Sequence, residues 1–342
     1  MTEFTIPETM RAHVFYENGE PTKVLQFKED YPVPKLAPNE LLVQVHATSI
    51  NPIDWKIIKG DIVAKFFKLP LVACFDFSGV VVAVGDKVTN FKVGEKVYGD
   101  NSPKGYGLAE YAPVPENNAH PMPKNLSFTE AAAVPLAGLT AWQAIVDTGN
   151  VKEGQRVLIN GGSGGVGSYA IQIAKYFGAE VTTTCSERNI ALVKSLGTDR
   201  VIDYTKENVT EIFKQNDFDI VFDTVGCPFY SSASTLMKPT GHYITIVGDG
   251  PHFLDGIFPL ITAVTRLVSR KLYARIVGGV TYDLLVTNAD GKGLQGLTKA
   301  IEEGKIKPLI DSTYRVEKAL EAIDHSITSR ASGKLVVIVK DD

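Results

Sequence analysis

The sequence carries one motif whose residue types and spacing point directly to chemistry, a glycine-rich turn at residues 160–167. Gly162, Gly164 and Gly167 fit the pattern G-x-G-x-x-G. In a turn that joins a strand to a helix, the first glycine permits the tight bend, the second lets the backbone approach a pyrophosphate, and the third lets the helix pack closely on the sheet. The amides at the start of the helix then face the phosphates. The motif predicts a dinucleotide-binding loop made of Gly162, Ser163, Gly164, Gly165, Val166 and Gly167.

The residues around this turn supply the context that the motif requires. Hydrophobic residues at 157–159 precede it, as expected of a buried strand. A segment with helical period follows, with Ala170 and Ile173 on its apolar face, and Gly178 stands where such a helix should end. The alternative, a flexible loop that contains glycines by chance, does not explain this context.

The end of the next predicted strand bears on which dinucleotide binds. About 20 residues past the glycines, NAD sites place an acid that binds the ribose. This sequence has Ser186 there, with Arg188 close behind. A hydroxyl and a guanidinium suit a ribose 2′-phosphate, which a carboxylate would repel, so NADPH is favoured. Glu187 keeps NADH open, because a shift of one residue would make it the ribose-binding acid and leave Arg188 as a solvated charge.

The elements that must position these residues fall into two regions. Residues 41–48 alternate between apolar and polar, which is the period of a strand. Further strands are predicted around 80–84 and 96–98, while the prolines near 32–34 and 113–115 are expected to interrupt strands because proline cannot donate to a ladder. The first third of the chain is therefore predicted to be a compact β-rich barrel or sandwich.

A second region begins near Ser127, where Ser127 and Glu130 form a capping box before an alanine-rich helix. Beyond it, short apolar strands alternate with segments of helical period. Such alternation predicts parallel strands joined by crossover helices, a doubly wound α/β sheet. The predicted strands are residues 156–160, 180–184, 219–223 and 243–247, and a last strand is predicted at 335–339.

Composition excludes several classes of protein. The 342 residues suggest two domains. The 35 basic residues against 39 acidic residues, with a net charge of −4, make duplex nucleic acid an unexpected partner. Cys74, Cys185 and Cys227 lie far apart, which argues against a disulfide scaffold and favours a reducing compartment. With neither a signal-peptide pattern nor an apolar run long enough for a membrane span, we expect a cytoplasmic protein.

Taken together, several segments resemble the medium-chain dehydrogenase/reductase family, in its zinc-free quinone oxidoreductase branch. Their order and spacing carry the resemblance, which runs nearly end to end and is strongest to plant enone and quinone reductases and to reticulon-interacting oxidoreductases. The segments are SINPID (49–54), FDFSGVV (75–81), VGEKV (93–97), AVPLAGLTA (133–141), the glycine turn, VIDY (201–204), FDTVG (222–226) and SGKLV (332–336).

The resemblance implies a domain arrangement. A GroES-like catalytic domain would comprise residues 1–134 and 308–342, and a Rossmann NADP-binding domain would comprise residues 135–307. It also implies an active site in the cleft between the domains and a homodimer.

The resemblance also bears on metal. Zinc-dependent relatives hold the catalytic metal with a Cys and a His, and the matching residues here are Asn51 and Phe75, so that only Asp76 is a candidate ligand. The loop of four cysteines that binds structural zinc is absent from the sequence as well. We therefore expect chemistry without a metal. Because no Lewis acid would polarise an isolated carbonyl, the expected acceptors are quinones or α,β-unsaturated carbonyl compounds, which conjugation already activates.

Two residues are candidates for catalysis by resemblance. Asn51 would orient the cofactor amide or the substrate oxygen, although its side chain could equally support the turn before Pro52. Lys56 aligns with a lysine of the plant enone reductases, and its ammonium would stabilise the enolate that develops in the transition state. The alternative for Lys56 is a surface lysine on an exposed turn.

Further cofactor contacts are implied at Thr140, at Val225 and Gly226, and at Tyr204, whose hydroxyl reaches the 2′-phosphate in relatives. The basic partner of that phosphate in relatives falls at Asn189, which is uncharged.

The sequence is therefore predicted to encode a zinc-independent, NADPH-dependent reductase of quinones or conjugated carbonyl compounds. Two alternatives remain open: an NADH-linked enzyme of the same branch, and a non-catalytic NADPH-binding interaction or scaffold protein.

Overall fold

The computed structural model describes residues 4–226, 229–248, 257–277, 279–289 and 291–341. Cys227 lies outside the described residues. The described chain divides into two compact units. The first comprises residues 1–139, 288–304 and 308–342, and the second comprises residues 140–287 and 305–307.

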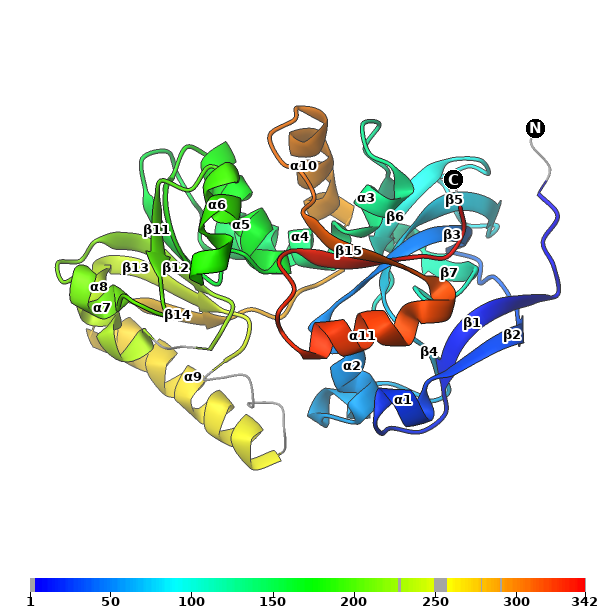
Figure 1. Ribbon diagram of the computed structural model, residues 1–342, viewed down its shortest axis with the longest axis horizontal. Coiled ribbons are helices and arrows are strands. Elements are labelled where there is room, and N and C mark those ends of the chain that lie inside the picture. Colours follow the sequence, from blue (N-terminus) through cyan, green and yellow to red (C-terminus); the bar gives the residue numbers. More distant parts are fainter. Residues whose placement is uncertain (1–3, 227–228, 249–256, 278, 290, 342) are drawn as a thin grey trace. The chain divides into compact units, whose positions relative to one another are not determined.

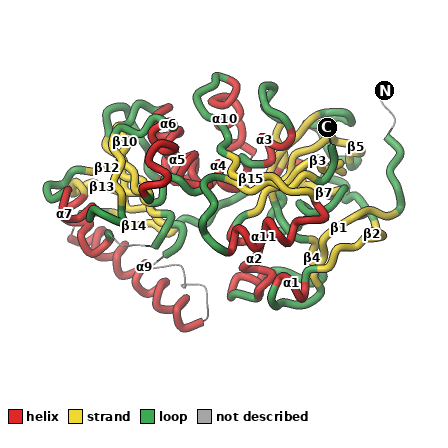
Figure 2. The backbone as a smooth tube through the Cα atoms, viewed as in Figure 1, coloured by secondary structure: helices red, strands yellow, loops and turns green. Residues whose placement is uncertain are grey.

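The first unit is built mainly of β-sheet (Figure 1, Figure 2). One of its sheets has the strand order β15-β16-β3-β5-β6-β8, with β7 paired to β3, and a smaller sheet has the order β2-β1-β4. The C-terminal strand β16 pairs with β3, so the tail rejoins the N-terminal region as predicted. The strands are β1 (Thr9–Phe15), β2 (Gln26–Pro32), β3 (Glu40–Ile50), β4 (Leu71–Val72), β5 (Asp76–Val84), β6 (Lys96–Asp100), β7 (Tyr111–Pro115), β8 (Ala119–Pro121), β15 (Ile310–Arg315) and β16 (Lys334–Ile338).

The prediction that prolines interrupt the chain at 113–115 is wrong, because β7 pairs antiparallel with β3 along this stretch. Pro113 lies opposite Leu42, and Pro115 lies opposite Glu40. The two prolines are two residues apart, so their missing N–H groups fall on the same side of the strand. Since β7 pairs only with β3 among the described strands, that side can face away from the ladder, where proline is tolerated.

Helices cover the sheet and close the core of the first unit. They are α1 (Pro21–Val24), α2 (Pro52–Lys59), α3 (Phe128–Ala132), α4 (Pro135–Trp142, which continues into the second unit), α10 (Gly291–Glu302) and α11 (Ala319–Ile327). The predicted capping box starts α3: the Ser127 hydroxyl accepts from the Glu130 amide at 3.3 Å, and the Glu130 carboxylate accepts from the Ser127 amide at 2.8 Å. Alternate residues of β3, including Val43 and Val45, are fully buried in this core.

The second unit is a parallel sheet with the strand order β11-β10-β9-β12-β13-β14. Numbered within the unit, this order is 3-2-1-4-5-6, which is the order of the Rossmann fold. The predicted fold class is thereby confirmed for this unit. Its strands are β9 (Arg156–Asn160), β10 (Glu180–Cys185), β11 (Arg200–Asp203), β12 (Phe218–Asp223), β13 (Met237–Thr245) and β14 (Thr281–Leu284).

Crossover helices pack on this sheet (Figure 1). The helix α5 lies against β9 and β10, and α9 lies against β14. Buried side chains such as Leu158, Phe218 and Tyr243 form the core beneath them. The helices are α5 (Gly165–Tyr176), α6 (Ile190–Ser195), α7 (Val209–Ile212), α8 (Ala233–Leu236) and α9 (Ile257–Val277). Among the helices that the structure describes, none combines the length and the apolar character that a membrane span needs.

Candidate functional site

The glycine-rich turn joins β9 to α5 at the point where the strand order of the second unit reverses. Two of its glycines are required by packing inside the protein. A Cβ on Gly162 would lie 2.0 Å from the Thr183 hydroxyl oxygen, and a Cβ on Gly167 would lie 2.2 Å from the Gly161 carbonyl oxygen. Neither position has room for a side chain without a shift of strand or turn.

Gly164 differs from these two. It is the N-cap of α5, with φ −77° and ψ 172°, a conformation open to any residue. The nearest atom to a Cβ built there is the Gly161 carbonyl oxygen at 3.5 Å, which is an ordinary contact. The packing of the described protein therefore does not require glycine here. A glycine keeps the start of α5 open to a group outside the chain, as a helix N-terminus that binds phosphate requires.

A buried polar network fixes the strand ends beside the turn. Asn160 ends β9, and its amide nitrogen donates to the Asp223 carboxylate at 2.7 Å. The Thr184 hydroxyl donates to the Asn160 side-chain oxygen at 2.7 Å. The same carboxylate accepts from the amides of Val225 at 3.0 Å and Gly226 at 3.1 Å. The network therefore ties the predicted contacts Val225 and Gly226 to the strand that leads into the glycine turn.

The residues predicted for the ribose follow β10. Ser186 is half-buried, Arg188 is exposed, and Asn189 is buried. The Asn189 amide donates to the Ser163 hydroxyl oxygen at 3.0 Å, so the uncharged residue at the relatives' basic position supports the glycine turn. Glu187 forms an exposed ion pair with Lys206 at 2.8 Å.

The two remaining predicted contacts lie elsewhere in the second unit. Tyr204 follows β11 and is 64% exposed. Its backbone amide donates to the Cys185 carbonyl at 3.2 Å, which keeps it beside the end of β10. Thr140 is buried, and its hydroxyl lies 2.7 Å from the Thr287 hydroxyl.

Asn51 belongs to the first unit, where it is the N-cap of α2 and is 4% exposed. Its backbone amide donates to the Asp54 carboxylate at 2.6 Å. Its side-chain amide nitrogen donates to the Asp76 carboxylate at 2.7 Å, and its side-chain oxygen accepts from the Lys334 amine. The carboxamide of Asn51 is therefore part of a buried polar cluster.

Asp76 is the centre of this cluster and is fully buried. One of its oxygens accepts from the backbone amide of Leu136 at 2.8 Å. The other accepts from the Ser49 hydroxyl and from the side-chain amide of Asn51. The Lys334 amine lies 3.7 Å from the second oxygen.

Burial and the neighbouring charges shift the pKa values of the ionisable side chains in this cluster. Burial raises the pKa of Asp54 to about 8. The hydrogen bond from the backbone amide of Asn51 opposes this rise, and the charges of Asp76 and Asp100 add to it. Burial also raises the pKa of Asp100 to about 6. For Lys334, burial lowers the pKa, and the Asp76 carboxylate opposes this shift.

Zinc, which is known for the resembled family, does not fit these donors. The Asp76 oxygens already accept three hydrogen bonds, and an amine lies where a cation would have to approach. Asn51 and Phe75 do not replace the thiolate and imidazole that zinc prefers. Across the described ranges, no group of three or more His, Cys, Asp or Glu side chains is arranged to hold a metal ion. The residues around Asp76 therefore do not form a zinc site.

Lys56 is half-buried and is the fifth residue of α2, directly after Asp54 and Trp55. Its amine lies over the Trp55 ring, 5.7 Å from the centroid. Lys59 lies over the same ring at the same distance and also pairs with Glu20 at 3.7 Å. The structure thus places two lysines on one aromatic ring, and Lys59 is a natural comparison for any function of Lys56.

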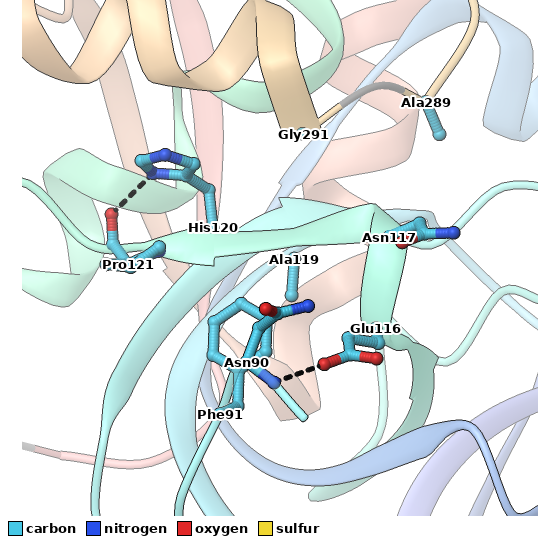
Figure 3. A pocket seen from close by; sticks show the side chains of 9 residues that line it. All are labelled: Asn90, Phe91, Glu116, Asn117, Ala119, His120, Pro121, Ala289 and Gly291. Carbon is cyan, nitrogen blue, oxygen red and sulfur yellow. Dashed lines mark hydrogen bonds between the residues drawn. The ribbon is translucent and has the colours of Figure 1, made fainter. Parts of the chain in front are cut away.

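The first unit also contains an open pocket of about 580 Å³ (Figure 3). Its polar lining includes Asn90, Glu116 and His120. The Glu116 carboxylate accepts from the backbone amide of Asn90 at 2.6 Å, and the His120 ring lies 3.0 Å from the Pro121 carbonyl oxygen. None of the residues predicted for catalysis or cofactor binding lines this pocket.

Comparison with known proteins places the chain in a family. Residues 37–124 match the family described as alcohol dehydrogenase GroES-like domain, and residues 196–337 match the family described as zinc-binding dehydrogenase. The chain is 36% identical over 347 residues to a 2-methylene-furan-3-one reductase of Solanum lycopersicum, an alignment that covers 98% of this chain and 81% of the relative. The chain belongs to the medium-chain dehydrogenase/reductase family.

Another medium-chain relative is the NADPH-dependent alkenal/one oxidoreductase, chloroplastic, of Arabidopsis thaliana, which is 34% identical over 344 residues, covering 97% of this chain and 80% of the relative. Among solved medium-chain structures, the quinone oxidoreductase from Coxiella burnetii superposes with a TM-score of 0.81 and 33% identity, covering 97% of this chain and 99% of that one. The comparisons confirm the predicted family and the predicted pairing of a GroES-like region with a Rossmann fold. They also support an oxidoreductase of the quinone and enone reductase type.

Sequence reasoning missed most of the supporting residues. Asp54, Asp100 and Lys334 lie at three separate places in the sequence, and only folding brings them into one cluster. A signal for Lys334 was available, since a lysine begins the apolar run 334–338. For Asn160 and Asp223 the signal was a polar residue at the last position of a buried strand.

Proposed function

We propose that this chain is an NADPH-dependent reductase that transfers a hydride to quinones or α,β-unsaturated carbonyl compounds without a metal. The observation that carries the proposal is the glycine turn at the point where the strand order of the Rossmann sheet reverses. Residue 164 of this turn is glycine although the packing has room for a Cβ there. The names of the tomato, Arabidopsis and Coxiella relatives support the reductase class.

Preference for NADPH is supported by the residues after β10. Ser186 stands where an NAD site has its acid, and Arg188 is two residues further on. Tyr204 is exposed and follows β11, the strand that pairs with β10. Glu187, the residue that favours NADH, is paired with Lys206, and this lysine adds a second positive charge to the region. The name of the Arabidopsis relative also specifies NADPH.

Bound reduced nicotinamide would supply the hydride. Gly162, Ser163, Gly164, Gly165, Val166 and Gly167 would hold its pyrophosphate, and Thr140, Val225 and Gly226 would contribute further contacts. Asn51 would orient a polar group of cofactor or substrate, because its carboxamide is held firmly by Asp76 and Lys334. Lys56 would donate a hydrogen bond to the oxygen on which negative charge develops. Because the donors around Asp76 do not suit zinc, we expect acceptors that conjugation activates.

The same enzyme class with NADH is the second candidate, favoured by Glu187 one residue past Ser186. The experiment that separates the candidates compares initial rates of NADPH and NADH oxidation with quinones, enals, enones and, as a control, saturated ketones. We expect oxidation of NADPH with conjugated acceptors, little with NADH and none with saturated ketones. Faster oxidation of NADH would favour the second candidate. Stoichiometric binding of NADPH with no oxidation across the panel would reject an enzyme in favour of a scaffold.

The functional domains are proposed to be residues 1–134 with 308–342, and residues 135–307. A homodimer is proposed from the family resemblance, and light scattering after gel filtration would test it by giving a mass near twice 37.1 kDa. The cytoplasmic location remains a prediction from the sequence.

A further inference from the structure

Lys334 is an unusual lysine, because it is 3% exposed at the start of β16. Lysine is almost never fully buried unless it is paired, since removal of its charge from water is costly. The cost must be offset by what surrounds the amine.

Oxygen atoms of three residues surround this amine. It donates to the Ile50 carbonyl at 3.3 Å and to the side-chain oxygen of Asn51, and the Asp76 carboxylate lies 3.7 Å away. Three acceptors suit the three donors of a protonated amine. The Asn51 amide nitrogen donates to the same Asp76 carboxylate at 2.7 Å, which closes a ring of Lys334, Asn51 and Asp76.

This ring determines which way the Asn51 carboxamide points. Rotation by half a turn would place the amide oxygen against the Asp76 carboxylate and the NH₂ group against the Lys334 amine. Both contacts would then be repulsive. In the observed orientation the second N–H of Asn51 makes only a long contact of 3.5 Å with the Ser49 carbonyl, so one donor remains for another group.

We propose that Lys334 is a positioning residue for the reduction, which acts by holding the Asn51 carboxamide in one orientation so that its remaining N–H can bind cofactor or substrate. This inference rests on the proposed function. The amine at the carboxamide oxygen also polarises the amide and strengthens that N–H as a donor. The competing role is purely structural, in which Lys334 only balances the charge of the buried carboxylates.

The two roles predict different outcomes for a double-mutant cycle of Asn51→Ala and Lys334→Met. If Lys334 acts through Asn51, each single variant lowers kcat for an enone by about 10- to 100-fold, and the double variant is no slower than the slower single variant, within about 2-fold. NADPH dissociation constants change much less than kcat, because the glycine turn that would hold the pyrophosphate is untouched. Multiplication of the two losses in the double variant would overturn the proposal, as would a Lys334→Met variant with wild-type kcat.

Lys340→Met is the matched control, since Lys340 lies on the same C-terminal tail but is exposed and bonded to Gln44. Its kcat should equal that of the wild type. Should Lys334→Met fail to fold, the pair Lys334→Met with Asp76→Asn removes both charges together and replaces it in the cycle. Adding Asn51→Ala to that pair is then expected to change kcat by less than 2-fold, and a loss of 10-fold or more would overturn the proposal.

A readout without turnover separates failure of this inference from failure of the proposed function. In thermal unfolding, Lys334→Met is expected to lower Tm by at least about 5 °C, and Asp76→Asn in that background is expected to restore part of the loss. If the wild type oxidises neither nucleotide with any acceptor while this coupling is present, the proposed function is wrong and the ring itself stands. Absence of coupling in Tm would refute the ring and the inference with it.

Discussion

The substitution Gly164→Ala tests cofactor binding separately from folding stability. In Gly164→Ala the added Cβ would meet its nearest described neighbour at 3.5 Å, and the backbone angles suit alanine. We therefore expect the free energy of unfolding to change by less than about 1 kcal/mol, because the gain typical of Gly→Ala at a compatible site is opposed by the weaker preference of alanine for the N-cap position. The methyl group would occupy the space in which a phosphate approaches the start of α5, so the dissociation constant of NADPH should rise at least about 10-fold, or about 1.4 kcal/mol.

Gly162→Ala and Gly167→Ala are the matched controls. Their Cβ atoms would lie 2.0 Å from the Thr183 hydroxyl and 2.2 Å from the Gly161 carbonyl, so both should lose about 1–3 kcal/mol of stability or more. Urea unfolding and quenching of protein fluorescence by NADPH measure the two quantities separately. A Gly164→Ala variant that binds NADPH as tightly as the wild type would refute the assignment of this turn to a pyrophosphate. A variant that loses stability as Gly162→Ala does would refute the packing argument.

The remaining predictions concern the ribose, the lysine on α2 and the buried carboxylates. Arg188→Ala should raise KM for NADPH about 10-fold, or about 1.4 kcal/mol, and leave KM for NADH unchanged in steady-state kinetics, whereas equal effects on both nucleotides would contradict a contact with the 2′-phosphate. Lys56→Met should lower kcat for enones about 10-fold or more at unchanged NADPH affinity, and Lys59→Met, which removes the other amine over the Trp55 ring, should not; equal effects would reduce Lys56 to a surface lysine. Asp54 keeps its proton in the folded state up to about pH 8, whereas the unfolded chain releases it near 3.8, so this group makes stability fall as pH rises through that window, by up to about 1.4 kcal/mol per pH unit. Urea unfolding between pH 5 and 8 should therefore give a shallower decline for Asp54→Asn, and parallel curves for variant and wild type would contradict the raised pKa.

Features that short segments encode were predictable from the sequence. The bounds predicted for β9, residues 156–160, agree with the structure, and the Ser127 capping box starts α3 as expected. These features depend on neighbours within a few residues, so hydrophobic period and cap chemistry suffice to find them. The glycine turn was likewise predictable from the sequence, because its strand, bend and helix follow one another along the chain.

Features that depend on pairing across the fold were not predictable in the same way. The prolines of β7 looked incompatible with a strand until the structure showed that they face one side of a strand paired only with β3 among those described. Lys334 and Asn51 are 283 residues apart, and no local pattern relates them. The sequence could nominate Asn51, but its hydrogen-bond partners come from the three-dimensional pairing of β16 with β3.

Transfer of a labelled hydride tests the central claim most directly. The wild-type chain would be incubated with NADPH that carries deuterium at both C4 positions of the nicotinamide and with an α,β-unsaturated ketone, and the product would be examined by mass spectrometry and NMR. The account predicts one deuterium at the β-carbon of the saturated ketone and none at the carbonyl carbon. Deuterium at the carbonyl carbon, or no reduced product with any quinone or enone, would contradict it.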